Sequence, residues 1–108
     1  MSNQTEVSET ITNCLHTICE AIASGDYDRF LSVGNEAYVQ GITQEQFETV
    51  SQQLAPRMAA GYDTVYLGQL KQAHYQIYLW KLSFEDGGDE YIIRMTMHSD
   101  RVAGILIT

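Results

Sequence analysis

The chain has 108 residues, the length of a single domain over 1–108, and its 44% hydrophobic and 19% charged residues are typical of a folded protein. Fourteen acidic residues against 6 basic ones give a formal net charge of −8, which excludes nucleic acid as an expected partner because phosphate backbones would be repelled. No apolar run approaches the roughly 18 residues of a membrane span, so no membrane association is expected. The segment 1–6 lacks the basic start of a secretory signal, and we expect a cytoplasmic protein.

The first part of the chain has the periodicity of amphipathic helices. Apolar residues recur every three or four positions from about residue 5 to residue 23, which predicts a helix with one apolar face. Gly25 follows as the left-handed residue that commonly ends a helix. Asp26 then caps a short second helix predicted over residues 27–32.

The region around residue 40 is ambiguous. Residues 36–40 fit either a short edge strand or one more helical turn, because periodicity cannot decide over so short a segment. Thr43 and Gln46 form a capping box, which predicts the start of a further helix that continues to Met58. Pro56 lies inside this pattern and is expected to kink the helix or end it early.

From Tyr62 the hydrophobic period changes from that of helices to that of strands. Four strands are predicted, and the expected connections are Lys71–Gln72, the acidic glycine-containing loop 85–89 and Ser99–Asp100. Strands joined by such short loops must pair antiparallel. Their ranges are 62–70, 74–84, 91–98 and 101–108, with a bulge expected at Gly104.

These elements predict an α+β fold with the N-terminal helices packed on one face of an antiparallel sheet of four strands, residues 36–40 being a candidate fifth strand. Alternation along residues 74–84 places Trp80 and Leu82 toward the helices and Ile77 and Leu79 on the opposite face. The predicted core consists of Ile11, Leu15, Ile18, Phe47, Val50, Leu54, Trp80, Leu82, Ile93 and Met95.

Several segments carry a family resemblance. The segment Ala21–Phe30, a helix end followed by Gly-Asp and a second helix with Phe, and the final strand segment Asp100–Ile105 resemble the NTF2-like superfamily, which has the cystatin-like fold. Further stretches resemble small uncharacterised bacterial members of that superfamily: Leu54–Arg57, Gly61–Tyr62, Tyr66–Gly68, Leu79–Leu82 and Asp86–Asp89. The resemblance implies a curved sheet with a ligand pocket between sheet and helices.

Aromatic side chains are the candidate lining of such a pocket. Enzymes of the superfamily place Asp, His and Tyr in an apolar cavity, and this chain contains seven tyrosines. A tyrosine hydroxyl in a pocket can orient a ligand, although tyrosine is also simply a favoured strand residue. The predicted ligand-binding residues are Tyr27, Tyr62, Tyr66, Tyr78, Trp80 and Tyr91.

No catalytic residue, metal site or cofactor is expected. His16 and Glu20 lie four residues apart but lack a third strong ligand, and Cys14 and Cys19 match no metal or redox spacing. Asp63 alternates with Tyr62 along its strand, so the two would share a face only through a bulge. The acidic loop 85–90 lacks the ligand spacing of a calcium loop.

The sequence favours a non-enzymatic module that binds a small apolar ligand or a protein partner. One alternative is an isomerase or dehydratase that uses a pocket tyrosine with Asp or His, and another is a small acidic inhibitor of the immunity-protein type. A homodimer is expected because the sheet face without helices is apolar. Its predicted contact residues are Tyr75, Ile77, Leu79, Ile92 and Arg94.

Overall fold

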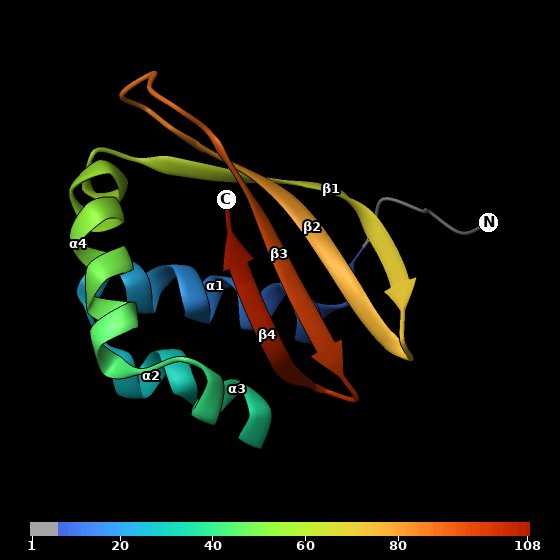
Figure 1. Cartoon of the computed structure of the whole chain (residues 1–108). Helices are drawn as coiled ribbons and strands as arrows, with labels where there is room; N and C mark the ends of the chain where they lie inside the picture. Colours follow the sequence, from blue (N-terminus) through green and yellow to red (C-terminus); the bar gives the residue numbers. More distant parts are fainter. Residues whose placement is uncertain (1–6) are drawn as a thin grey trace.

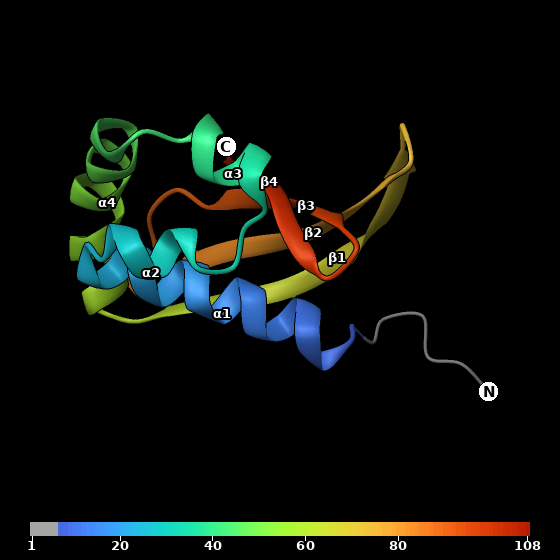
Figure 2. The same cartoon turned by 90° about the horizontal axis from the view of Figure 1, so that it is seen from below.

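The computed structural model describes residues 7–108, in which four helices lie on one face of a curved, antiparallel four-stranded sheet (Figures 1 and 2). This confirms the predicted α+β class. The helices are α1 (Glu9–Ser24), α2 (Tyr27–Leu31), α3 (Glu36–Gly41) and α4 (Gln44–Ala59). The strands are β1 (Tyr62–Gln72), β2 (Tyr75–Phe84), β3 (Tyr91–His98) and β4 (Arg101–Ile107).

The strands follow one another as a meander in the order β1-β2-β3-β4, so that β1 and β4 form the two edges of the sheet. The turn between β1 and β2 consists of Ala73 and His74, both of which have positive φ angles (50° and 72°). Two such residues match the twist of the flanking strands. The predicted turn at Lys71–Gln72 is therefore wrong, because both residues pair with β2 in the ladder.

The core lies between the helices and the face of the sheet that carries Trp80, Leu82 and Ile93. Figure 2 shows α1 crossing beneath this face. Nine of the ten predicted core residues are buried, and the exception is Val50, which is 37% exposed. Val50 lies on the half of α4 that stands beside an open pocket, and it therefore has no sheet residue packed over it.

The helices begin and end at positions that local side chains explain. α1 begins at Glu9, later than the predicted residue 5, because the Ser8 side chain accepts the backbone N–H of Ile11 and caps the helix there. The capping box of Thr43 and Gln46 is confirmed at the start of α4.

Two predictions about helices are corrected. Residues 36–40 are not a strand: they belong to α3, because the Asn35 side chain accepts the backbone N–H of Tyr38 and starts a helix. α4 also continues past Pro56 to Ala59. The proline ring is exposed, and the buried Met58 holds the last turn against the core.

Bulges occur in both edge strands. In β1 the register shifts at Leu67, between Tyr66 and Gly68, which lies beyond the Tyr62–Asp63 pair and leaves those two residues on opposite faces. In β4 the register shifts next to Gly104, where the sequence predicts a bulge. Within residues 7–108, none of the helices combines the length and apolarity that crossing a membrane requires.

Candidate functional site

An apolar pocket of about 200 Å³ opens between the first half of α4, the ends of α1 and α2, and the second half of β4. Every lining residue except Gln46 is apolar, and none of them carries a titratable side chain. The lining consists of Ile22, Phe30, Ile42, Gln46, Phe47, Val50, Ile105, Leu106 and Ile107.

Aromatic contacts form the inner wall of the pocket. Phe30 of α2 packs on Phe47 of α4 with 4.8 Å between ring centroids, and on Tyr38 of α3 at 5.2 Å. The buried Tyr38 hydroxyl donates to the carbonyl of Phe30 at 3.0 Å, which satisfies a polar group that burial would otherwise penalise. This cluster holds the short helices α2 and α3 against α4 beside the cavity.

Tyr27 supports the pocket from outside. Its ring packs on Phe47 at 5.5 Å, and its hydroxyl donates to the carbonyl of Ile42. Both partners line the cavity, whereas Tyr27 does not. Tyr27, one of the predicted ligand-binding residues, therefore contacts the lining without belonging to it.

Three other predicted residues form an aromatic row on the helix-covered face of the sheet. Trp80 is 4% exposed and packs against Tyr66 and Tyr78, with ring centroids at 5.8 and 6.2 Å. The Tyr78 hydroxyl donates to the Gln76 side chain at 2.9 Å. These side chains fill the layer between sheet and helices and do not line the apolar pocket.

Tyr91 belongs to a polar contact at the opposite end of α4. Arg57 lies over the ring of Phe84 at 3.9 Å and near that of Tyr91 at 5.8 Å. Its guanidinium donates to both carboxylate oxygens of Asp86 at 2.8 and 3.1 Å, and to the carbonyl of Asp89 at 2.7 Å. The acidic loop after β2 is thereby attached to α4.

This attachment explains the titration of Asp86. The hydrogen bonds from Arg57 lower the pKa of the Asp86 carboxyl to about 2, and the backbone N–H of Gly88 contributes in the same direction. The carboxylate is therefore ionised throughout the physiological pH range and forms an ion pair with Arg57. The loop acts as a structural connection in this arrangement.

Tyr62 lines a second cleft, of about 220 Å³, between α1 and the start of β1. The cleft is polar and includes Asp63 and His16, so the residue types expected of an acid–base site come together here. Its remaining lining residues are Cys19, Glu20 and Thr64. No described hydrogen bond joins Tyr62, Asp63 and His16 to one another.

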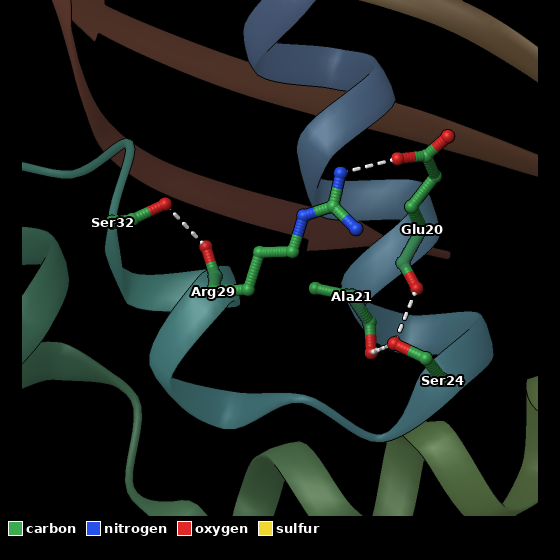
Figure 3. A network of polar contacts seen from close by, with 5 residues as sticks. All are labelled: Glu20, Ala21, Ser24, Arg29 and Ser32. Carbon is green, nitrogen blue, oxygen red and sulfur yellow. Dashed lines mark hydrogen bonds and ion pairs between the residues drawn. The ribbon is translucent and has the colours of Figure 1, made fainter.

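Two groups of this cleft are constrained, Glu20 by an ion pair and Cys19 by burial. Figure 3 shows Arg29 reaching from α2 to form an ion pair with Glu20, while Ser24 donates to the backbone carbonyl of Glu20 at 2.8 Å. Burial raises the pKa of the Cys19 thiol to about 12, which disfavours the thiolate that a nucleophile requires. Within residues 7–108, no three His, Cys, Asp or Glu side chains are placed to hold a metal ion.

None of the residues that line the apolar pocket was among the predicted ligand-binding residues. Ile42 and Gln46 come from a helix start that reads as ordinary capping, and Val50 reads as a core position. The one available signal is Ile105–Ile107, an uninterrupted apolar run at the uncharged end of the last strand. Comparison of the chain with protein-family models, curated proteins and solved structures gave no significant match.

Proposed function

We propose that this chain is a non-enzymatic binding module whose apolar pocket accepts a single apolar group. The observation that carries the proposal is the lining: aliphatic and aromatic side chains surround the cavity, with Gln46 as the one polar residue. A cavity of about 200 Å³ is smaller than the roughly 300–1,000 Å³ of typical small-molecule pockets. It suits one ring or one branched aliphatic group.

We also propose that the chain belongs to the NTF2-like superfamily and that it is cytoplasmic. The order of helices and the curved meander support the first, since both agree with what the sequence resemblance implies. The two buried, unpaired thiols of Cys14 and Cys19 support the second, because free cysteines suit a reducing compartment.

Toluene is a suitable probe for the pocket. In a titration followed by amide chemical shifts, we expect saturable changes in Val50, Ile105 and Ile107. The variant Val50→Trp should abolish them, because Val50 is 37% exposed at the pocket and an indole there would occupy the cavity. Val39→Trp is the matched control, since Val39 is 40% exposed but lies outside the lining. Toluene binding that persists in Val50→Trp would contradict the proposal.

The enzymatic alternative would use the polar cleft instead. It is favoured by the joint presence of Tyr62, Asp63 and His16 in one lining. A screen of small ketones and hydroxy acids for isomerisation or dehydration tests it. Turnover that disappears in both Asp63→Asn and His16→Ala, with the fold intact, would replace the binding proposal with this one.

We also propose that the chain forms a homodimer through the sheet face opposite the helices. Val65 and Ile92 are 44% and 45% exposed on that face, on either side of Lys81 in the strand register. An apolar face of this kind usually marks an interface. Lys81 and Arg94 also lie on this face, which reduces the repulsion between two subunits of charge −8.

Light scattering tests the dimer. The expected mass is twice the 12.2 kDa of one chain. The double variant Val65→Glu with Ile92→Glu should be a folded monomer, because both carboxylates would flank Lys81 on the strand register. Val39→Glu, a substitution of an equally exposed valine on α3, should leave the dimer intact. A wild-type mass near that of one chain at micromolar concentration would disprove the dimer.

A further inference from the structure

The second half of β4 has an open hydrogen-bonding edge. Ile92 and Thr108 exchange both of their backbone hydrogen bonds, at 2.8 and 3.0 Å. Such hydrogen-bonded pairs alternate with non-bonded pairs along an antiparallel ladder. The backbone N–H and C=O groups of Leu106 therefore also point toward β3, whereas those of Ile105 and Ile107 point away from it. Among the described backbone hydrogen bonds, none reaches these outward groups of Ile105 and Ile107.

The first half of the same edge is already occupied by the chain itself. The Val102 N–H donates to the carbonyl of Val33 at 3.0 Å, and the Asn35 N–H donates to the carbonyl of Val102 at 2.8 Å. Gly34 thus forms a parallel bridge with Val102 and packs so closely on Tyr38 that a Cβ there would lie 1.9 Å from its ring. The added segment ends at Asn35, which caps α3, so the edge beyond Val102 stays uncovered.

The uncovered half lacks the usual protection of an edge strand. Natural edges are interrupted by charged residues, prolines or bulges that prevent a further strand from pairing. β1 has such features in its bulge at Leu67 and in Lys71. The bulge of β4 lies before this half, between Val102 and Gly104, and residues 104–108 have neither a charge nor a proline. Leu106 is 54% exposed. An apolar edge of this kind pairs readily with an extended chain.

The apolar pocket lies directly beside this edge. Ile105 and Ile107 contribute both to the pocket lining and to the open edge, and α4 forms the opposite wall with Phe47 and Val50. Alternate side chains of a strand point to the same face of a sheet. A strand added to β4 would therefore direct every second side chain toward the helix side, where the cavity of about 200 Å³ has room for one of them.

The charges around the site favour a basic partner segment. No Lys or Arg lines the pocket, and α4 carries the exposed Glu45 and Glu48, each adjacent in sequence to a lining residue. The whole chain has a net charge of −8. Complementary charge accelerates association and disfavours acidic competitors.

We propose that the outer edge of β4 binds an extended, basic peptide segment of a partner protein, which joins the sheet as a fifth strand and inserts one apolar side chain into the pocket. The backbone groups of Ile105 and Ile107 supply the hydrogen bonds, and the pocket selects the side chain. This inference rests on the proposed function of the pocket and adds the class of partner.

A synthetic heptapeptide tests the proposal: it has Phe at the centre, Thr and Val in the flanking positions, Lys at both ends and blocked termini. We expect saturable binding, with slowed hydrogen exchange at the amides of Ile105 and Ile107. The same peptide with alternate backbone amides N-methylated should bind about tenfold more weakly, as expected for the loss of one or two hydrogen bonds. A version with Glu at both ends should also bind more weakly.

Three protein variants separate the parts of the site. Ile107→Pro should weaken the peptide more than Ile107→Ala does, because both shorten a lining side chain but only proline also removes an outward N–H that the β3 ladder does not use. Val50→Trp should abolish the binding of both peptide and toluene. Equal binding of the N-methylated peptide would overturn strand addition. Toluene binding without peptide binding would also overturn strand addition, but it would agree with the proposal that the pocket binds an apolar group. Protection of Ile105 and Ile107 that rises with protein concentration alone would show a second copy at this edge and would overturn the peptide partner.

Discussion

The two faces of the sheet carry similar side chains but have different surroundings. On the covered face, Leu82, Ile93 and Met95 are essentially inaccessible beneath the helices. On the free face, Val65 and Ile92 remain nearly half exposed, although their residue types are equally apolar. Apolar alternation therefore marks both faces of a central strand, and only the placement of the helices decides which face becomes the core.

The free face is not uniform. Ile77 lies on it and is 4% exposed, yet it does not belong to the cluster beneath the helices. Its cover comes from neighbouring side chains on the same face, including those of Leu70 and Thr96, its partners across the sheet. The curvature of the sheet thus buries one residue without any second layer.

The largest expected effect is on the covered face. Trp80→Ala should lower the free energy of unfolding by about 3–5 kcal/mol, because it removes a buried aromatic side chain and leaves a cavity between Tyr66 and Tyr78. Ile92→Ala, on the free face, should cost less than about 1 kcal/mol in the monomer, since much of its surface is already in water.

Urea denaturation of both variants measures this contrast. The experiment requires a concentration below the dimer dissociation constant, so that the free face is compared without a partner. Similar losses for Trp80→Ala and Ile92→Ala would show that side chains on the two faces contribute equally to the free energy of unfolding, which would contradict the expected difference.

An intermediate effect is expected at Ile77. Ile77→Ala should cost about 2 kcal/mol, at the low end for buried aliphatic residues, because neighbours on an open face can move into the space. The cost should increase with protein concentration if a second subunit covers this face. A loss below about 0.5 kcal/mol would indicate that the burial of Ile77 contributes no packing energy.

The fold was largely predictable because its signals are local. Asp26 and Thr43 cap helices at their predicted positions, and the alternation in β2 correctly places Trp80 and Leu82 toward the helices. The short segment 36–40 was not predictable, because one turn of helix and a short strand show no distinct period. Its helical form follows from Asn35, whose side chain caps the helix while its backbone N–H donates to the carbonyl of Val102.

The pocket was not predictable from local patterns. Val50 has the spacing of a core residue, but the cavity between that part of α4 and the end of β4 leaves it exposed. The predicted aromatic residues do lie largely on the covered face, but they pack against one another there. A cavity depends on how several elements are placed relative to one another, so the sequence of a single segment does not predict it.

A smaller effect concerns the helices on the covered face. The buried Ser51 of α4 donates its hydroxyl to the carbonyl of Ile22 at the end of α1, at 2.6 Å. Ser51→Ala should cost about 1 kcal/mol, the usual net value of one hydrogen bond, and should leave the sheet unaffected. Thr49→Ala is the control, because Thr49 is exposed and bonds within its own helix. Thermal unfolding of the two variants provides the measurement, and equal stabilities would contradict a role for this contact.

The smallest effect is the dependence of stability on pH at the rim of the covered face. The pKa of Asp86 is lowered from 3.8 to about 2 in the folded protein by its hydrogen bonds with Arg57. A carboxyl with a lowered folded pKa stabilises the protein above its unfolded value, and this contribution is lost as the pH falls from 3.8 toward 2. Asp86→Asn should therefore flatten the decline of the urea midpoint in that range, and high salt should reduce the difference because the pair lies at the surface. In an Arg57→Met background the same substitution should have a smaller effect, because the hydrogen bonds that lower the pKa of Asp86 are then absent. The contrary result is a parallel loss of stability by Asp86→Asn and wild type from about pH 4 to about pH 2. That result would show that the attachment of this loop to α4 does not depend on the ionised carboxylate. The contacts of Arg57 with Phe84 and Tyr91 would then be sufficient to hold the loop against α4.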